Sequence, residues 1–123
     1  MTGYMSEKTS NMRVLFCFGV SQALFDVKAA ELRPVLEIIT EAFQSLGPRF
    51  GLKVLGTFDD DQLMMGPSGE WPWTAYILAD APDYDAVVAV CNLIRTTSVG
   101  EYRLSRYMRV EARVGRSLFF GND

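Results

Sequence analysis

The sequence predicts an α+β domain, βαββαβ in element order, with a four-stranded antiparallel sheet and two helices on one face. Four segments have the composition or alternation of strands, and two have the three- and four-residue spacing of amphipathic helices. The length of 123 residues suits one domain. We expect it to cover residues 12–120, after a disordered leader of polar residues at 1–11.

The first strand is predicted at residues 12–21, in the middle of the sheet. Its sequence, MRVLFCFGVS, is apolar at both alternations: Val14 and Phe16 fall at one, Leu15 and Cys17 at the other. A strand of this kind is buried on both faces. The expected sheet order therefore has the last strand beside the first, then the third, with the second strand at the far edge.

The first helix is predicted at residues 34–46, after a connection that contains one helical turn at 26–32. Pro34 belongs in its first turn, because a proline deeper inside a helix clashes with the preceding turn. The pair Gly47-Pro48 is expected to end it. Its apolar side consists of Val35, Leu36, Ile39, Phe43 and Leu46.

The second and third strands are predicted at residues 52–60 and 73–80, as a wide hairpin. The loop between them, residues 61–72, contains Gly66-Pro67-Ser68-Gly69, the strongest turn signal in the chain.

The second half of the chain repeats the order helix, then strand. A helix is expected at about residues 84–96, with Asp83 as its N-cap. A connection at 97–103 is expected to hold one helical turn around Gly100. The last strand, residues 104–119, alternates clearly. Its apolar face consists of Met108, Val110, Ala112, Val114 and Leu118, and its polar face of Tyr107, Arg109, Glu111 and Arg113.

Composition excludes several function classes. The net charge of −3 argues against nucleic acid, which normally selects basic domains. No apolar run approaches the ~18 residues of a membrane span, and no signal-peptide pattern opens the chain, so a cytoplasmic protein is expected. Histidine is absent. That removes Ser-His-Asp catalysis, His-ligated haem and ordinary zinc sites.

The two cysteines, Cys17 and Cys91, lie among apolar residues inside predicted elements. They have no C-x-x-C spacing, so we expect buried thiols and no metal site.

The first strand also predicts a homodimer. The helices cover only one face of the sheet, so a second copy, related by two-fold symmetry, is expected to cover the other. Residues 59–85 carry seven acidic side chains and no Lys or Arg, whereas residues 95–116 carry six Arg and two Glu. The two segments either meet across the dimer or are ordinary solvated charge.

This pattern resembles the dimeric α/β-barrel superfamily of ferredoxin-like domains, over about residues 12–119. That superfamily includes small monooxygenases of antibiotic biosynthesis and muconolactone isomerases. Three stretches further resemble the small accessory proteins encoded in bacterial indole-acetate degradation clusters: FGLKVLGTFDDDQ (50–62), GEWPWTAYILAD (69–80) and RYMRVEARVGRSLF (106–119).

The resemblance implies a ligand cavity between the sheet and its helices, and a role in the breakdown of aromatic or indolic compounds. Several members act without a metal or organic cofactor, and none is expected here. Haem-using branches rely on a histidine that this chain lacks.

Three groups of residues are candidates for a site. Trp71 and Trp73 flank Pro72, where they either stack on a flat ligand or pin the loop to the core. Tyr76 and Tyr107 can each place a polar group in an apolar pocket, although core tyrosines are commoner.

The second group is the polar row of the last strand. Arg109, Glu111 and Arg113 are either the solvated side or, on a covered face, must be paired or meet an anionic ligand.

The third group is the run Asp59, Asp60 and Asp61. Adjacent carboxylates raise one another's pKa and so provide a general base, or bind a divalent cation weakly, or simply end a strand in solvent. We take Asp59, Tyr76 and Arg109 as the catalytic candidates. Trp71, Trp73, Tyr107, Glu111 and Arg113 are the candidates for binding substrate.

Three functions are compatible with these features. The first is a cofactor-independent enzyme that oxygenates, isomerises or dehydrates an aromatic or indolic acid. The second is a non-catalytic accessory protein that binds such an intermediate for a partner oxygenase. The third is a structural dimer with a filled interior.

Overall fold

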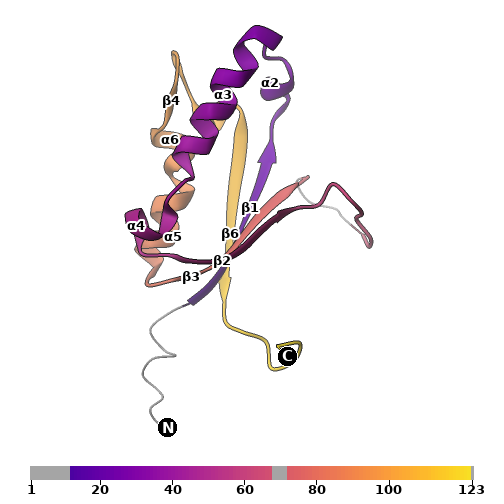
Figure 1. Ribbon diagram of the computed structural model, residues 1–123, viewed down its shortest axis with the longest axis vertical. Helices are drawn as coiled ribbons and strands as arrows, with labels where there is room; N and C mark the ends of the chain where they lie inside the picture. The colour runs from indigo at the N-terminus through magenta and orange to yellow at the C-terminus, as the bar shows by residue number, and fades with distance from the viewer. Residues whose placement is uncertain (1–11, 68–71, 123) are drawn as a thin grey trace.

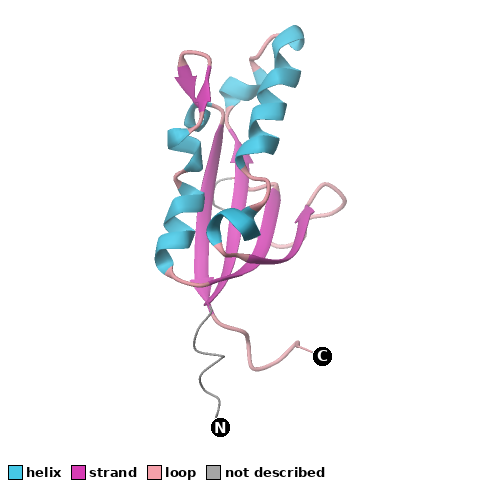
Figure 2. Ribbon diagram, turned by 60° about the vertical axis from the view of Figure 1, so that its left-hand side comes forward, coloured by secondary structure: helices cyan, strands magenta, loops and turns pink. Residues whose placement is uncertain are grey.

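The computed structural model describes residues 12–67 and 72–122, which form a sheet with helices along one of its faces (Figures 1 and 2). The candidate residue Trp71 and the expected leader at 1–11 lie outside this range. The elements in chain order are β1 (Met12–Val20), α2 (Gln22–Phe25), α3 (Ala29–Ala42), α4 (Leu46–Phe50), β2 (Lys53–Asp59), β3 (Ala75–Ala81), α5 (Tyr84–Cys91), α6 (Leu93–Thr96), β4 (Ser98–Val99), β5 (Tyr102–Arg103), the 3₁₀ helix η2 (Leu104–Arg106) and β6 (Met108–Gly115).

The sheet confirms the predicted topology. Its strands lie in the order β2-β3-β1-β6, and all neighbours are antiparallel. With one helical segment after β1 and another after β3, this is the ferredoxin-like arrangement. β1 is a central strand, as its apolar sequence predicts.

The two faces of the sheet differ in cover. Side chains alternate along a strand, and Val14 and Phe16 of β1 are fully buried under the helices. Leu46 of α4, together with Val87 and Val90 of α5, belongs to the same core cluster. No helix of the described chain covers the other face, called here the open face; in Figure 2 the helices stand on one side of the sheet.

The helical segment after β1 differs from the prediction. α3 begins at Ala29, so Pro34 lies inside it, where its missing N–H leaves the Ala30 carbonyl without its usual i−4 bond. The predicted stop Gly47-Pro48 was also wrong, because both residues lie in α4. The chain breaks instead at Ser45, whose φ of 56° is left-handed. Pro48 fits there because it lies in the first turn, whose N–H groups have no helical acceptor.

In the second half of the chain, the predicted helix and the connection after it are divided into shorter elements than predicted. Asp83 caps α5 as expected, and its carboxylate accepts a 2.8 Å hydrogen bond from the Ala86 N–H. However, Asn92 separates α5 from α6. The helical turn expected around Gly100 is a small hairpin of β4 and β5, with Gly100 at a φ of 61°.

The last strand is shorter than predicted at both ends. Residues 104–106 form η2, and β6 covers only Met108–Gly115. Beyond it, Leu118, Phe119 and Phe120 are exposed instead of extending the apolar face of a strand. Within the described residues, none of the helices has the length and apolarity required to cross a membrane.

Candidate functional site

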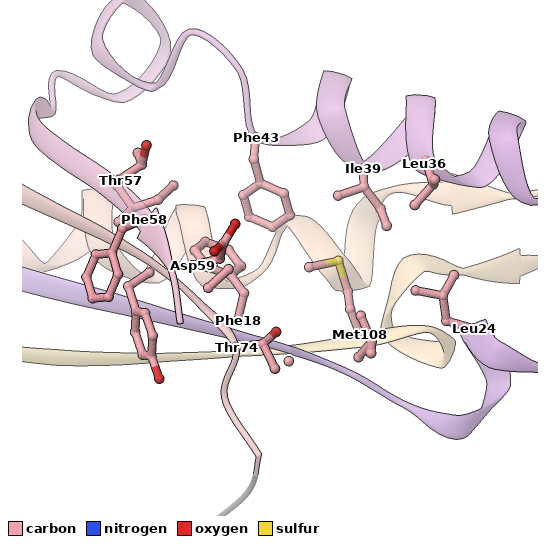
Figure 3. Close-up of a pocket in the computed structure, with 15 residues that line it drawn as sticks. Phe18, Leu24, Leu36, Ile39, Phe43, Thr57, Phe58, Asp59, Thr74 and Met108 are labelled. Carbon is pink, nitrogen blue, oxygen red and sulfur yellow. The ribbon is translucent and has the colours of Figure 1, made fainter. Parts of the chain in front are cut away.

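A pocket of about 500 Å³ lies between the sheet and α3, and it opens to solvent (Figure 3). α3 supplies one wall through Leu36, Ile39 and Phe43, and in Figure 3 these side chains reach toward the strands. The floor includes Phe18, whose ring meets that of Phe43 edge-on at 5.1 Å. The lining residues are Phe18, Gly19, Val20, Leu24, Leu36, Ile39, Phe43, Thr57, Phe58, Asp59, Thr74, Ala75, Tyr76, Ile77 and Met108.

The pocket exists because α3 does not extend over the outer part of the sheet. All seven residues of β2 are exposed, including those on the helix side. β3 is likewise only partly covered at its start, where Ala75 and Ile77 line the pocket. An apolar surface is therefore left open next to the packed core.

Asp59 provides the one charged side chain among the described lining residues. It is the last residue of β2, and its register with Ala75, itself opposite Phe18, places it on the helix side of the sheet. In Figure 3 its carboxylate points into the space beneath Phe43. An ionised carboxylate accepts hydrogen bonds and donates none. The pocket therefore offers an apolar surface and one strong acceptor.

The neighbouring acids behave differently from one another. The pKa of the Asp61 carboxyl is raised, first because it shares a hydrogen bond with the Asp59 carboxyl and second because the Asp59 charge repels its own. Asp60 is on the opposite alternation and accepts a 3.0 Å hydrogen bond from the Tyr76 hydroxyl. The Asp59 carboxylate thus acts on Asp61, and it also accepts a 3.4 Å hydrogen bond from the Asp61 backbone N–H.

Tyr76 touches the pocket but presents its hydroxyl elsewhere. Its ring stacks on Phe58 at 4.9 Å, and its hydroxyl reaches Asp60 and the Trp73 carbonyl. The pKa of this phenol is raised by partial burial and then by the Asp60 carboxylate. Tyr76 is therefore placed to order the end of β2 rather than to face Asp59.

The predicted row on the last strand lies outside the pocket. Arg109, Glu111 and Arg113 project from β6 onto the open face, opposite Gly19, Cys17 and Leu15 of β1. Glu111 accepts two contacts from Arg113, at 2.8 Å from Nε and 2.6 Å from Nη2. Three strand spacings, roughly 14 Å, and the thickness of the sheet separate Arg109 from Asp59. The structure does not bring the three catalytic candidates together.

The remaining binding candidates lie at the edges of this site or in the core. Trp73 is half-buried just before β3 and is not among the lining residues. Tyr107 was predicted on the polar face of the last strand, and this was wrong. It follows η2 with helical backbone geometry, so the alternation of β6 does not include it, and it is buried with Leu104 and Met108.

The sequence interpretation missed most of the lining residues. Leu36, Ile39 and Phe43 were identified only as the apolar side of a helix. The sequence did contain a signal for a pocket here. The strand that faces these α3 side chains ends in carboxylates, which packing alone does not require. Among the described residues, no group of three or more His, Cys, Asp or Glu side chains could hold a metal ion.

The fold and the site together define a ferredoxin-like α+β domain with one apolar, carboxylate-bearing pocket. No family model matches the chain, and a search of curated proteins gave no match. Among solved structures, the chain is similar to a dimeric protein of unknown function and ferredoxin-like fold from Bacteroides fragilis. The TM-score is 0.37 at 15% sequence identity, over 85% of this chain and 95% of that chain. A similarity at this level says nothing about ligand or reaction.

Proposed function

We propose that the protein binds a small aromatic molecule of the indole or phenol kind in the pocket between sheet and α3. The observation that supports this proposal most strongly is that the pocket has a mostly apolar lining, which is interrupted by the carboxylate of Asp59. A volume of about 500 Å³ lies within the range of small-molecule sites, which are mostly apolar with a few placed polar groups. Phe18 and Phe43 offer ring surfaces for a flat ligand.

Asp59 selects among aromatic ligands. It favours an N–H or O–H group, such as that of an indole or a phenol, over a second anion. If the ligand is an acid, its carboxylate has to point away from Asp59, toward the open mouth of the pocket, because like charges repel. The arginines Arg109 and Arg113 are on the other face and do not assist there.

In its enzymatic form the proposal is a cofactor-independent proton transfer. Asp59 takes the proton from the ligand N–H or O–H, or from a carbon next to it, and returns it at another position. An isomerisation of this kind needs one base that is within hydrogen-bond reach of the proton. Catabolism of an aromatic or indolic intermediate is the setting that we propose.

A second candidate function is binding without turnover, as in an accessory protein that delivers an intermediate. One observation favours it: Tyr76 hydrogen-bonds Asp60 and the Trp73 carbonyl. Among the described lining residues it is the only other ionisable side chain, so no separate acid opposes Asp59.

Titration calorimetry with indole and phenol, each with and without a carboxylate substituent, tests the proposal. Wild type should bind, and Asp59→Asn should weaken the binding of N–H donors by about ten- to a hundredfold, since a hydrogen bond to a charged group contributes roughly 1.5–3 kcal/mol. Asp85→Asn, which removes an exposed charge from α5, is the matched control. Equal affinity in wild type and Asp59→Asn, or no binding at all, overturns the proposal. Mass spectrometry of the ligands after incubation, with and without oxygen, separates enzyme from binding protein.

We further propose that the protein is a homodimer that pairs through the open face of its sheet. The apolar part of this face, called here the open-face stripe, consists of Leu15, Cys17, Phe58, Tyr76 and Leu78. The register places them in two adjacent rows across β2, β3 and β1. The exposed fraction is 62% for Phe58 and 36% for Leu78.

Ion pairs border the open-face stripe. Arg13 meets Asp80 at 2.7 Å at one end, and Glu111 meets Arg113 along β6. An apolar centre with a polar border is the usual anatomy of a protein interface. A second copy offers the same stripe by two-fold symmetry.

Leu78→Glu tests this pairing. It places charges at the centre of the proposed interface and should convert the dimer to a folded monomer. Val88→Glu makes the same change at an exposed site on α5 and should leave the dimer intact. A dimer that survives Leu78→Glu contradicts the open-face interface.

A further inference from the structure

Two segments of the chain expose apolar side chains that no part of the described fold covers. The first is the loop after β2, where Leu63, Met64 and Met65 are 73%, 59% and 82% exposed. The second is the segment after β6, where Leu118, Phe119 and Phe120 are 61%, 95% and 58% exposed. We call residues 61–65 the methionine loop and residues 116–120 the aromatic tail.

The two segments carry opposite charge. The methionine loop follows Asp59 and Asp60 and begins with Asp61. The aromatic tail begins with Arg116 and follows Arg113. Each thus combines three consecutive apolar side chains with charge of one sign, and the signs are complementary. Methionine side chains adapt readily to aromatic partners, and sulfur–ring contacts add to the attraction.

The fold sets the starting points of these two segments far apart within one chain. β2 and β6 are the two outer strands of the sheet. The register places Asp59 at the end that contains Phe18, and Gly115 at the opposite end, beside Arg13. The loop and the tail therefore leave from opposite ends of the two outer strands, at diagonally opposite corners of the sheet.

The tail is too short to cross this diagonal. Three strand spacings and five residues along a strand separate the corners by about 22 Å. The five residues from Gly115 to Phe120 span at most about 17 Å when fully extended. In the structure both segments stay exposed, so the tail does not cover its own methionine loop.

A second copy removes this obstacle. Two sheets pack face to face either nearly aligned or crossed at about 90°. Consider a crossed pair whose two-fold axis lies between the sheets, along the diagonal that joins the two remaining corners. The corner where one subunit's methionine loop begins then lies over the corner where its partner's aromatic tail begins. The same operation brings the two open-face stripes together.

We propose that the aromatic tail of each subunit packs on the methionine loop of its partner, next to the rim of the partner's pocket at Asp59. The contact occurs twice in the dimer. It rests on the open-face homodimer proposed above, and it does not require that the pocket binds a ligand.

Variants that each add one cysteine test the contact directly. Met65→Cys and Phe119→Cys, each in the full chain, are unfolded together, refolded as a mixture and oxidised. Mixed dimers should form a disulfide between the two variants, identified by mass spectrometry of the linked peptides. Val88→Cys mixed with Phe119→Cys is the matched control, since Val88 is also exposed but lies on α5. Wild type reports any background from Cys17 and Cys91.

The outcomes separate this inference from the dimer itself. A disulfide between positions 65 and 119 in the mixture, absent from the control mixture, supports the contact. Links only between identical positions overturn it, as does a dimer by light scattering that yields no link. A monomer by light scattering overturns the inference and the open-face dimer together.

Charge exchange provides a second readout. Asp61→Lys and Arg116→Glu should each raise the dimer dissociation constant about two- to fivefold, as expected for an exposed ion pair. Mixing the two variants should recover nearly all of the loss, because in the mixed dimer one contact pairs the two reversed charges and the other is the unchanged pair of Asp61 and Arg116. If each variant alone leaves the dissociation constant unchanged, the charges do not meet.

Discussion

The two faces of β1 are similar in sequence but have different surroundings in the fold. On the helix side, Val14 and Phe16 have no exposed surface and belong to the core under α4 and α5. On the open face, Cys17 is almost buried by its neighbours, whereas Leu78 in the row next to it remains partly exposed. This difference is what the proposed dimer accounts for, since β1 is apolar at both alternations but the helices of its own chain cover only one face (Figure 2).

The helix side of the sheet also differs between its centre and its outer part near β2. Under the helices the core is closed, but near β2 the helix side is open and forms the pocket with Asp59 at its rim. One face of the sheet thus contains both the packed core and the pocket, and the other face has no helix of the described chain over it (Figure 2).

The largest expected effect comes from the covered face. Phe16→Ala should lower the free energy of unfolding by about 3–5 kcal/mol, because it removes a fully buried ring and leaves a cavity. Leu15→Ala, one residue away on the open face, should cost much less in dilute protein and more at concentrations that populate the dimer. Chemical denaturation at two protein concentrations measures both. If both variants lost the same free energy of unfolding at both protein concentrations, the two faces would not differ as described.

A smaller effect concerns the phenol on the open face. The pKa of Tyr76 lies above its ordinary value of 10.0 because of burial and the Asp60 carboxylate. A raised folded-state pKa contributes stability that is fully present below pH 10 and is lost as the pH rises through the folded value. Tyr76→Phe should remove this dependence and the corresponding late step in the ultraviolet titration of phenolate. A wild-type tyrosine titration with no late step contradicts the Tyr76–Asp60 contact.

The topology was predictable because hydrophobic pattern determines which residues must be buried. β1 was correctly placed as a central strand, and Asp83 as the cap of α5. The boundaries were less predictable, since they depend on single backbone geometries such as the left-handed Ser45 and the hairpin at Gly100. The alternation around Tyr107 failed for this reason, because the chain passes through a 3₁₀ turn before β6 and Tyr107 lies outside the strand.

The site was only partly predictable. Asp59 was identified from the run of three aspartates, and the structure places it at the pocket. The sequence analysis grouped Asp59 with Arg109, but the structure separates them. The sequence does not say on which face and at which edge of the sheet each strand residue lies. The walls from α3 have the same pattern as a packed core, and only the position of the helix over the sheet shows that they enclose a space.

The central claim is that the open face is an interface between two copies of this chain. Light scattering coupled to size-exclusion chromatography, across a series of concentrations, tests it most directly. The account predicts a particle of twice the 13.8 kDa chain mass at working concentration. A particle of 13.8 kDa at every concentration would contradict it.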